Sequence, residues 1–391
     1  MSSPFFTVVI PAYNKPETLP YTLATCLKQV EFDDFEVLIS DGSDINNNLN
    51  YDAIKEHIGD RVRYIRPSEV MGYYEHWEWI LDSVRGEYVI YIGDDDGLTR
   101  DALYEYYECV KATGAEAVTS NLMSYQWPGF EFPPQVAEKN NTGTFWRTVP
   151  NDGAKYHVMN SEKVLEKVLN YEAPVVMLPF VYRATVKREL IMSIRKKYGG
   201  YFNGAPMDLY AALLTASNLK EYVLVDKALS IIGSSVKSTA YAEHVLGGNT
   251  NATKDFFARK PKGADYSLKY KSLMWNDAVF RDAMETWAER TSRKLPVMGF
   301  CGALWRACLS SYTETRSANM KKLLIHAAKN HYLSPLLLAG AALAVKSLTK
   351  KSAERDNSDV VMQYSGEEWN FNDVDSFAQA CYDFCFSEPA L

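Results

Sequence analysis

Three consecutive carboxylates, Asp94, Asp95 and Asp96, are the residues of this chain best suited to chemistry. They follow residues 88–93, an apolar stretch rich in β-branched and aromatic side chains that predicts a strand. Carboxylate oxygens are ligands that Mg²⁺ and Mn²⁺ prefer, and such an ion can in turn hold a diphosphate. The alternative is a solvated acidic turn, which the flanking glycines also favour.

The elements that precede this triplet predict how it is positioned. Residues 5–10 and 35–40 are runs of β-branched and aromatic side chains, and apolar residues recur at helical spacing between them. This order predicts a β-α-β unit in which both strands end in polar, turn-forming segments. Because ligands of open α/β sheets bind at the carboxyl ends of the strands, the segments that begin at Pro11 and Asp41 are candidates for ligand contacts.

Three motifs near the N-terminus point to a known family. They are Thr7-Val-Val-Ile-Pro-Ala-Tyr-Asn14, Glu36-Val-Leu-Ile-Ser-Asp-Gly-Ser43 and Gly86-Glu-Tyr-Val-Ile-Tyr-Ile-Gly-Asp-Asp-Asp96. In this order they resemble the opening signatures of the family-two glycosyltransferases, over residues 1–125 and more weakly to residue 240. The resemblance implies an α/β, Rossmann-like domain of the GT-A fold. It also implies inverting transfer of a sugar from a nucleotide-diphosphate donor to an acceptor, usually with a divalent metal.

The resemblance also gives roles to individual residues. Asp95 and Asp96 become the candidate ligands of Mg²⁺ or Mn²⁺, while Asp94 should face the ribose because successive strand residues point to opposite sides. Asp41 should hydrogen-bond the edge of the base. Turn formation or helix capping is the alternative for Asp41 and Asn14. Contacts to base and ribose are expected from the loop after the first strand, which comprises Pro11, Ala12, Tyr13 and Asn14.

Two positions depart from the family pattern. Many members carry Asp-Asp-Gly-Ser after the second strand, whereas this chain has Ser40 at the first of these positions, which leaves Asp41 as the carboxylate for the base. Residues 71–79 stand where many members have an Arg-Asn segment. The donor contacts from this stretch and the choice of nucleotide therefore stay open. Uridine is the default, since UDP-sugars are the commonest donors of the family.

An inverting transfer needs a base that takes the proton of the acceptor hydroxyl. In the family this base is a carboxylate at the start of a helix well after the metal strand, and Asp208 resembles it in placement. The alternative is that Asp208 only complements the helix dipole. Lys237, in a segment with glycine and serines, could pair with phosphate or be an ordinary exposed lysine. His244 is a weaker candidate for a late metal ligand.

Composition and charge narrow the remaining interpretations. The chain has 391 residues, too many for one compact core, so we expect a catalytic domain over residues 1–250 and a mainly helical region over residues 251–391. The net charge of -7 argues against a nucleic-acid partner. The six scattered cysteines form no disulfide or zinc pattern, and no signal peptide is apparent. We therefore expect a cytoplasmic location.

Three other segments carry expectations of their own. Residues 335–345 form the longest apolar run, which is too short to span a bilayer. Because lysines flank this run, residues 320–351 could lie on the anionic inner face of a membrane; the alternative is a buried helix with solvated ends. Residues 125–155 lose periodicity and predict a long loop, and residues 356–365 predict a polar break.

The favoured function is a metal-dependent inverting glycosyltransferase that builds a surface polysaccharide or glycolipid. Two alternatives stay open, namely an inactive relative that binds a sugar or a partner and a nucleotidyltransferase on a similar fold. A nucleotidyltransferase usually has a glycine-rich, basic phosphate loop after the first strand, but this chain has Pro-Ala-Tyr-Asn with only Lys15 nearby. The sequence specifies neither the donor sugar, nor the acceptor, nor the oligomeric state.

Overall fold

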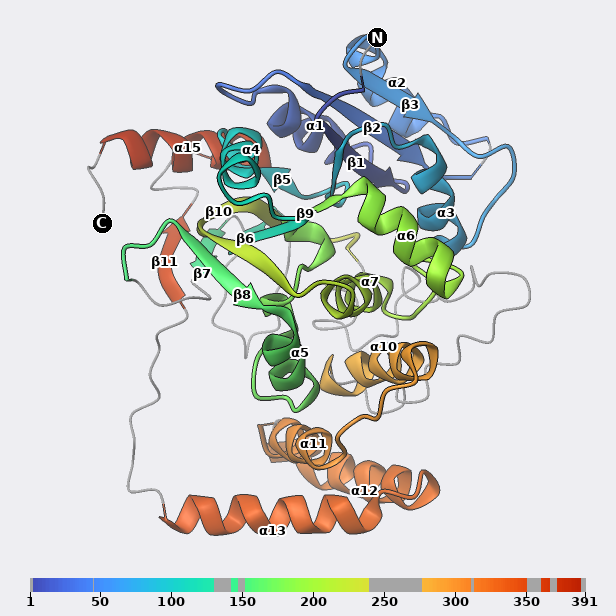
Figure 1. The fold of residues 1–391 in the computed structure, drawn as a ribbon, viewed down its shortest axis with the longest axis vertical. Helices are drawn as coiled ribbons and strands as arrows, with labels where there is room; N and C mark the ends of the chain where they lie inside the picture. The colour runs from blue at the N-terminus through green and yellow to red at the C-terminus, as the bar shows by residue number, and fades with distance from the viewer. Residues whose placement is uncertain are drawn as a thin grey trace.

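The computed structural model describes residues 3–44, 46–129, 142–146, 152–238, 276–310, 313–349, 360–365 and 371–387. Its N-terminal part contains the predicted parallel β-α-β core (Figure 1). In the centre, β1 (Phe6–Ala12) pairs in parallel with β2 (Phe35–Asp41) on one side and with β4 (Tyr88–Tyr91) on the other. Outside β2 runs β3 (Val62–Ile65), also parallel. The β-branched and aromatic runs expected to form strands therefore do so.

The described strands form one mixed sheet in the order β11-β7-β6-β9-β4-β1-β2-β3. Antiparallel β9 joins the parallel half to β6, and β7 and β11 follow antiparallel at the outer edge. β10 pairs in parallel with β6 and antiparallel with β5 and β8. The strands beyond the parallel half are β5 (Gly97–Leu98), β6 (Ala117–Gln126), β7 (Thr142–Trp146), β8 (Tyr156–Asn160), β9 (Ala184–Lys187), β10 (Glu221–Ser234) and β11 (Val360–Ser365).

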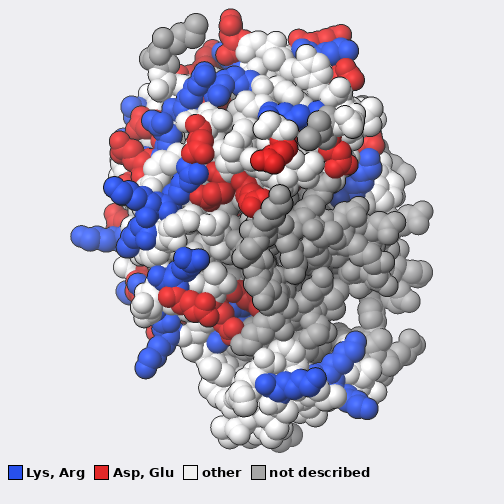
Figure 2. Space-filling view, turned by 90° about the vertical axis from the view of Figure 1, so that its right-hand side faces the viewer, with Lys and Arg blue, Asp and Glu red and all other residues white. Residues whose placement is uncertain are grey.

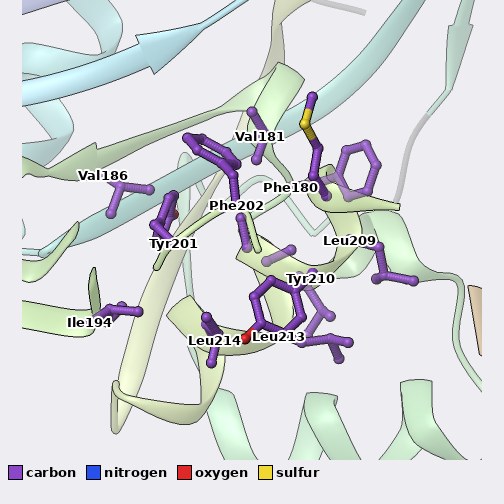
Figure 3. Packing of buried hydrophobic residues seen from close by; sticks show 14 of the residues in the cluster. Phe180, Val181, Val186, Ile194, Tyr201, Phe202, Leu209, Tyr210, Leu213 and Leu214 are labelled. Carbon is purple, nitrogen blue, oxygen red and sulfur yellow. The ribbon is translucent and has the colours of Figure 1, made fainter. Parts of the chain in front are cut away.

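Helices cover both faces of this sheet, because the residues of its buried central strands are apolar on both sides. On one face, Val8 and Ile10 of β1 pack with α1 (Leu19–Leu27), α2 (Leu49–Ile54) and α4 (Ala102–Thr113). On the other, Val9 belongs to a larger cluster with α3 (Tyr73–Ile80), α5 (Ser161–Leu169), α6 (Arg188–Tyr198) and α7 (Met207–Ser217). Figure 3 shows part of this cluster, with Leu209, Tyr210 and Leu213 of α7 close to Phe180 and Phe202.

The C-terminal region is mainly helical, as expected. Trp287 of α10 (Asn276–Thr291) packs against α7 and donates its indole N–H to the Ser217 hydroxyl at 3.1 Å. Below it lie α11 (Met298–Ser310), α12 (Thr313–Lys329) and α13 (Leu333–Thr349), which have a hydrophobic cluster of their own (Figure 1). No helix among the described residues is both long and apolar enough to cross a bilayer. The short 3₁₀ helices are Lys55–His57, Leu81–Ser83, Val175–Met177 and Val181–Arg183.

The chain then returns to the sheet. β11 extends the sheet beyond β7, and α15 (Val374–Ser387) packs on α1 and β5. Phe377 of α15 stacks on Tyr125, and Arg100 binds the Asp375 carboxylate at 2.7 Å. The boundary expected at residue 250 stays a prediction, but residues 360–365 and 371–387 contact the sheet of the N-terminal part.

Several local expectations need correction. The sequence predicts a helix over residues 184–198, but residues 184–187 form β9 and the helix α6 begins only at Arg188. Thr185 and Val186 pair with both β4 and β6, which explains the strand. Residues 125–155, expected to be a long loop, contain β7. Residues 356–365, expected to be a polar break, contain β11. The two strands pair with each other, which a search for local periodicity does not detect.

Candidate active site

The triplet Asp94–Asp96 follows β4 as a tight turn whose backbone is held from three directions. Thr18 and Thr22 donate their hydroxyls to the carbonyls of Asp94 and Asp96, each at 2.7 Å. The Trp127 indole N–H donates to the Asp95 carbonyl at 2.9 Å. All three carbonyl oxygens are therefore engaged, and the acidic side chains are what the turn offers to a ligand.

The three carboxylates are buried, each residue being 5–6% exposed. Asp94 Oδ1 and Asp95 Oδ2 both contact the Lys15 ammonium, at 2.9 and 3.0 Å. Asp94 also accepts the Tyr13 N–H at 2.8 Å, and Asp95 accepts the Ser235 hydroxyl at 2.5 Å. A single side-chain cation among the described residues thus contacts this group of acids.

Asp96 is held differently from its two neighbours. Its carboxylate accepts the N–H groups of Gly93 and Gly233, at 2.6 and 2.7 Å. Burial, followed by the charge of Asp95, raises the pKa of Asp96 to about 7, although the two N–H groups oppose the rise. Burial also raises the pKa of Asp94 despite the nearby Lys15. Both rises have the same origin, because desolvation and like charges disfavour ionisation of a carboxyl group.

The expectation that Asp94 and Asp95 point to opposite sides does not hold. β4 ends at Tyr91, so the triplet lies in a turn and strand alternation does not apply to it. Both side chains instead reach the same ammonium. Within the described residues, no three acidic, histidine or cysteine side chains are grouped so that they could hold a metal ion by themselves.

Asp41, the expected contact to the base, is fully buried at the end of β2. Its oxygens accept the Tyr64 hydroxyl at 2.6 Å, the Ser43 N–H at 3.0 Å and the Asn50 amide at 3.1 Å. Arg66 completes the set with an ion pair at 3.1 Å. A base edge that reached Asp41 would therefore have to displace one of four donors.

The expected nucleotide loop lies between these two acidic sites. Pro11 and Ala12 are the buried last residues of β1, and Ala12 pairs with Asp41 in the sheet. Asn14 has a left-handed backbone, with φ of 51°, which asparagine tolerates better than most residues. Its N–H donates to the Ser43 hydroxyl at 2.9 Å. These contacts agree with the turn-forming alternative for Asn14 and put the loop at the expected edge.

Asp208 is in the first turn of α7, whose start at Met207 confirms the predicted helix. Leu209 donates its N–H to Asp208 Oδ1 at 2.8 Å. Burial raises the pKa of Asp208 to about 6, with that N–H opposing the rise. A carboxylate in this state is mostly ionised at pH 7 and still basic enough to accept a proton.

Two tyrosines that the sequence reasoning missed are affected by the charges of both Asp208 and the triplet. Tyr73 and Tyr182 hydrogen-bond each other. Burial raises the pKa of Tyr73; the bond to Tyr182 opposes the rise, and the charges of Asp208 and Asp94 add to it. Burial likewise raises the pKa of Tyr182, and Asp208 and Asp96 contribute. Tyr73 belongs to residues 71–79, where this chain departs from the family pattern. That departure was the signal in the sequence that could have pointed to Tyr73.

The segment after β10 also contributes to the site. A Cβ at Gly233 would lie 1.7 Å from the Asp95 carbonyl oxygen, so only glycine permits this approach. Lys237 lies beside the nucleotide loop, with its ammonium 2.6 Å from Glu17 and 3.4 Å from the Asn14 carbonyl. His244 lies outside the described residues. Gly233, near the end of β10, and Ser235, just after it, thus hold the triplet in place.

Comparison with known proteins gives the family of the N-terminal part. The family model described as glycosyl transferase family 2 matches residues 7–174. None of the curated proteins matches the chain. Among solved structures, S. aureus TarS 1-349 in complex with UDP-GlcNAc is 12% identical and has a TM-score of 0.46, with 93% of this chain and 97% of that chain covered.

A second solved structure is similar over a comparable length. The mannosyltransferase PcManGT from Pyrobaculum calidifontis, in complex with GDP-Man and Mn²⁺, is 18% identical, with 89% of this chain and 88% of that chain covered and a TM-score of 0.38. Overlaps this loose carry no argument about the donor or metal of the present chain. The family match instead indicates a glycosyl transferase family 2 domain over residues 7–174, less than half of the chain, and the described strands form the mixed sheet with flanking helices that is expected of a GT-A-type domain.

Proposed function

We propose that this chain moves a sugar from a nucleotide-diphosphate donor, by default a UDP-sugar, to a saccharide or lipid-linked acceptor with inversion at the anomeric carbon. The observation that carries the proposal is the buried acidic triplet after β4, within the part of the chain that matches the family model. The charges of Asp94, after β4, and of Asp208, at the start of α7, both act on Tyr73. A diphosphate site beside a proton acceptor is the arrangement that this transfer requires.

The triplet has a suitable donor set for a divalent cation. It offers hard carboxylate oxygens, and its buried acids outnumber the one ammonium that the described residues supply. Asp95 is a predicted ligand and also contacts that ammonium, so we propose it as a ligand of Mg²⁺ or Mn²⁺. Two residues are candidates for the second ligand. Asp96 is the one predicted from the sequence, and Asp94 is the one that shares the Lys15 ammonium with Asp95. When bound, the ion would stabilise negative charge on the departing diphosphate.

The chain's own residues would perform the proton transfer. Asp208 accepts the proton of the acceptor hydroxyl while that oxygen bonds to the anomeric carbon and the bond from this carbon to the diphosphate breaks. Tyr73 and Tyr182 are proposed to orient the acceptor, since their hydroxyls hydrogen-bond each other and the charge of Asp208 acts on both. The loop from Pro11 to Asn14 is proposed to line the nucleoside site, with Asp41 holding the adjacent end of β2 in place and Lys237 as the phosphate contact.

A screen of nucleotide sugars with the full chain tests the proposal. Thermal shift and donor hydrolysis would be measured for uridine, guanosine and thymidine diphosphate sugars, each in Mn²⁺, in Mg²⁺ and in chelator. We expect one donor to be hydrolysed slowly and only with metal. Binding without turnover of any donor and acceptor would support an inactive relative. Release of pyrophosphate from a nucleoside triphosphate and a sugar phosphate would support a nucleotidyltransferase.

We further propose that the enzyme works at the cytoplasmic face of an anionic membrane through α12 and α13. Leu337 and Leu338 on α13 are 53% and 63% exposed, while Leu336 on the same helix is buried against the neighbouring helices. Residues 298–349 contain one acid, Glu314, in an otherwise acidic chain. Figure 2 shows basic and no acidic side chains at the bottom of this face. The basic residues in the sequence from 298 to 349 are Arg306, Arg316, Lys321, Lys322, Lys329 and Lys346.

Flotation with liposomes tests this location. The chain should float with vesicles that contain anionic lipid at low salt, and less so at high salt, because electrostatic attraction to the surface is screened. Leu337→Ser with Leu338→Ser should abolish flotation, whereas the matched pair Ala341→Ser with Ala342→Ser should weaken it less. No flotation of the wild type at low salt would contradict the proposal.

A further inference from the structure

Lys15 is the residue whose position the proposed reaction does not yet explain. It lies in the loop between β1 and α1, and its backbone N–H is fixed by the Asn50 side-chain oxygen at 3.1 Å. Its side chain is 12% exposed, and its ammonium contacts one carboxylate oxygen of Asp94 and one of Asp95. The charges of these two acids outweigh the effect of burial and raise the pKa of Lys15.

The ammonium therefore occupies the point where the two carboxylates converge. A divalent cation bound by the same two oxygens would be within a few ångströms of Nζ, and two positive charges at that distance repel strongly in a buried site. The Lys15 ammonium and a divalent cation therefore cannot occupy the site between these two oxygens at the same time. The lysine stem is flexible while its backbone is anchored, so the side chain can move without moving the loop.

We infer that Lys15 is an internal competitor of the metal: its ammonium neutralises Asp94 and Asp95 in the donor-free protein, and the divalent cation enters by displacing it. This inference rests on the metal use proposed above. The nucleotide diphosphate assists the exchange, because its oxygens give the displaced ammonium a new anionic partner. Metal and nucleotide should therefore bind with positive coupling, and metal alone should bind weakly.

Mn²⁺ binding to the full chain, measured by the loss of the free-ion electron paramagnetic resonance signal, tests the competition without any turnover. Lys15→Met removes the competing charge, so Mn²⁺ without nucleotide should bind at least roughly tenfold more tightly than to the wild type. Adding UDP should tighten Mn²⁺ binding strongly in the wild type and much less in Lys15→Met. Lys28→Met removes an exposed charge that pairs with Asp375 and not with the triplet, and it should change Mn²⁺ affinity by less than roughly twofold.

Thermal unfolding gives a second readout. In chelator, Lys15→Met should melt at least about 5 °C below the wild type, because buried carboxylates lose their cation, and Mn²⁺ should restore most of this loss. If Lys15→Met does not fold, Lys15→Arg tests the same idea. Arginine keeps the charge and binds carboxylates through a fork of donors, so metal alone should bind more weakly than to the wild type.

The outcomes separate this inference from the proposed function. Equal Mn²⁺ affinity of the wild type, Lys15→Met and Lys15→Arg, with binding lost in Asp95→Asn, would leave the metal site standing and overturn the competition. Absence of Mn²⁺ binding in the wild type and in Lys15→Met, with and without UDP, would overturn metal use and the competition together. Tighter binding in Lys15→Met with a diminished effect of UDP supports the inference.

Discussion

Two acidic sites at the same edge of the parallel strands are neutralised in different ways. Asp41, after β2, receives four donors from within the chain, including Tyr64 and Arg66. The triplet after β4 has three buried carboxylates and one ammonium, and its remaining donors are backbone N–H groups and the Ser235 hydroxyl. A carboxylate that is fully satisfied internally stabilises the fold, whereas surplus buried charge favours binding a cation. The first site should therefore matter for stability and the second for turnover.

The largest effect on turnover is expected from Asp95→Asn. The variant removes the proposed metal ligand, and the stabilisation lost in the transition state, several kcal/mol, corresponds to a rate loss of roughly 10⁴-fold. Stability in chelator should be unchanged or raised, because one of the crowded charges is gone. Transfer rate and melting temperature are to be measured on the same preparation. Normal turnover in chelator would remove the metal from the mechanism.

Asp208→Asn comes next. The amide keeps the shape of the side chain but cannot take the acceptor proton, so kcat and kcat/KM should both fall by roughly 10²–10⁴-fold while donor affinity stays unchanged. Glu189→Gln is the matched control, since Glu189 is exposed on α6 and pairs only with Lys187 among the described residues. Near-normal turnover of Asp208→Asn would contradict its role as base and favour the helix-dipole alternative.

The pH dependence of the wild type follows from the same residue. Burial raises the pKa of Asp208 to about 6, so the base is protonated and inactive below that pH. Turnover should fall about tenfold per pH unit below pH 6 and level off above it. A raised carboxylate pKa also means that the ionised form opposes folding above pH 6 and that this effect fades as the pH falls. Asp208→Asn should therefore not lower the melting temperature at pH 8, whereas loss of a helix-dipole contact would lower it.

Asp41→Asn should show the opposite pattern to Asp95→Asn. It leaves the Arg66 guanidinium without its buried partner and should lower the free energy of unfolding by roughly 3 kcal/mol. Turnover of the folded fraction should change by less than roughly threefold. Chemical denaturation measures the free energy of unfolding, and steady-state kinetics measure turnover and the donor KM. If the donor KM rises more than tenfold with stability unchanged, Asp41 contacts the base and the contrast between the two sites is wrong.

The sequence predicted the elements that order these sites better than the contacts within them. β1, β2, β4 and α7 were predicted because apolar periodicity and strand-ending polar residues are local signals. The bridge from Lys15 to the triplet, and the approach of Gly233 to Asp95, join residues far apart in the chain. Charge pairing of this kind depends on how loops pack in three dimensions. For the same reason, the pairing of β7 with β11 was not expected.

The smallest expected effect belongs to Lys237, which lies beside the loop that contains Asn14 and tests how far the donor extends from the triplet. Its ammonium pairs with exposed Glu17 and contacts the Asn14 carbonyl, and exposed pairs of this kind contribute little to stability. Lys237→Met should therefore leave the melting temperature unchanged. If the donor diphosphate reaches this edge of the loop, the donor KM should rise by roughly three- to tenfold with kcat unchanged, because a contact made equally in ground and transition states is lost. Lys237→Arg should keep most of the affinity, since either side chain can pair with phosphate. An unchanged KM in Lys237→Met would show that the donor is held by the triplet and the loop from Pro11 to Asn14 alone, and Lys237 would then be an ordinary exposed lysine.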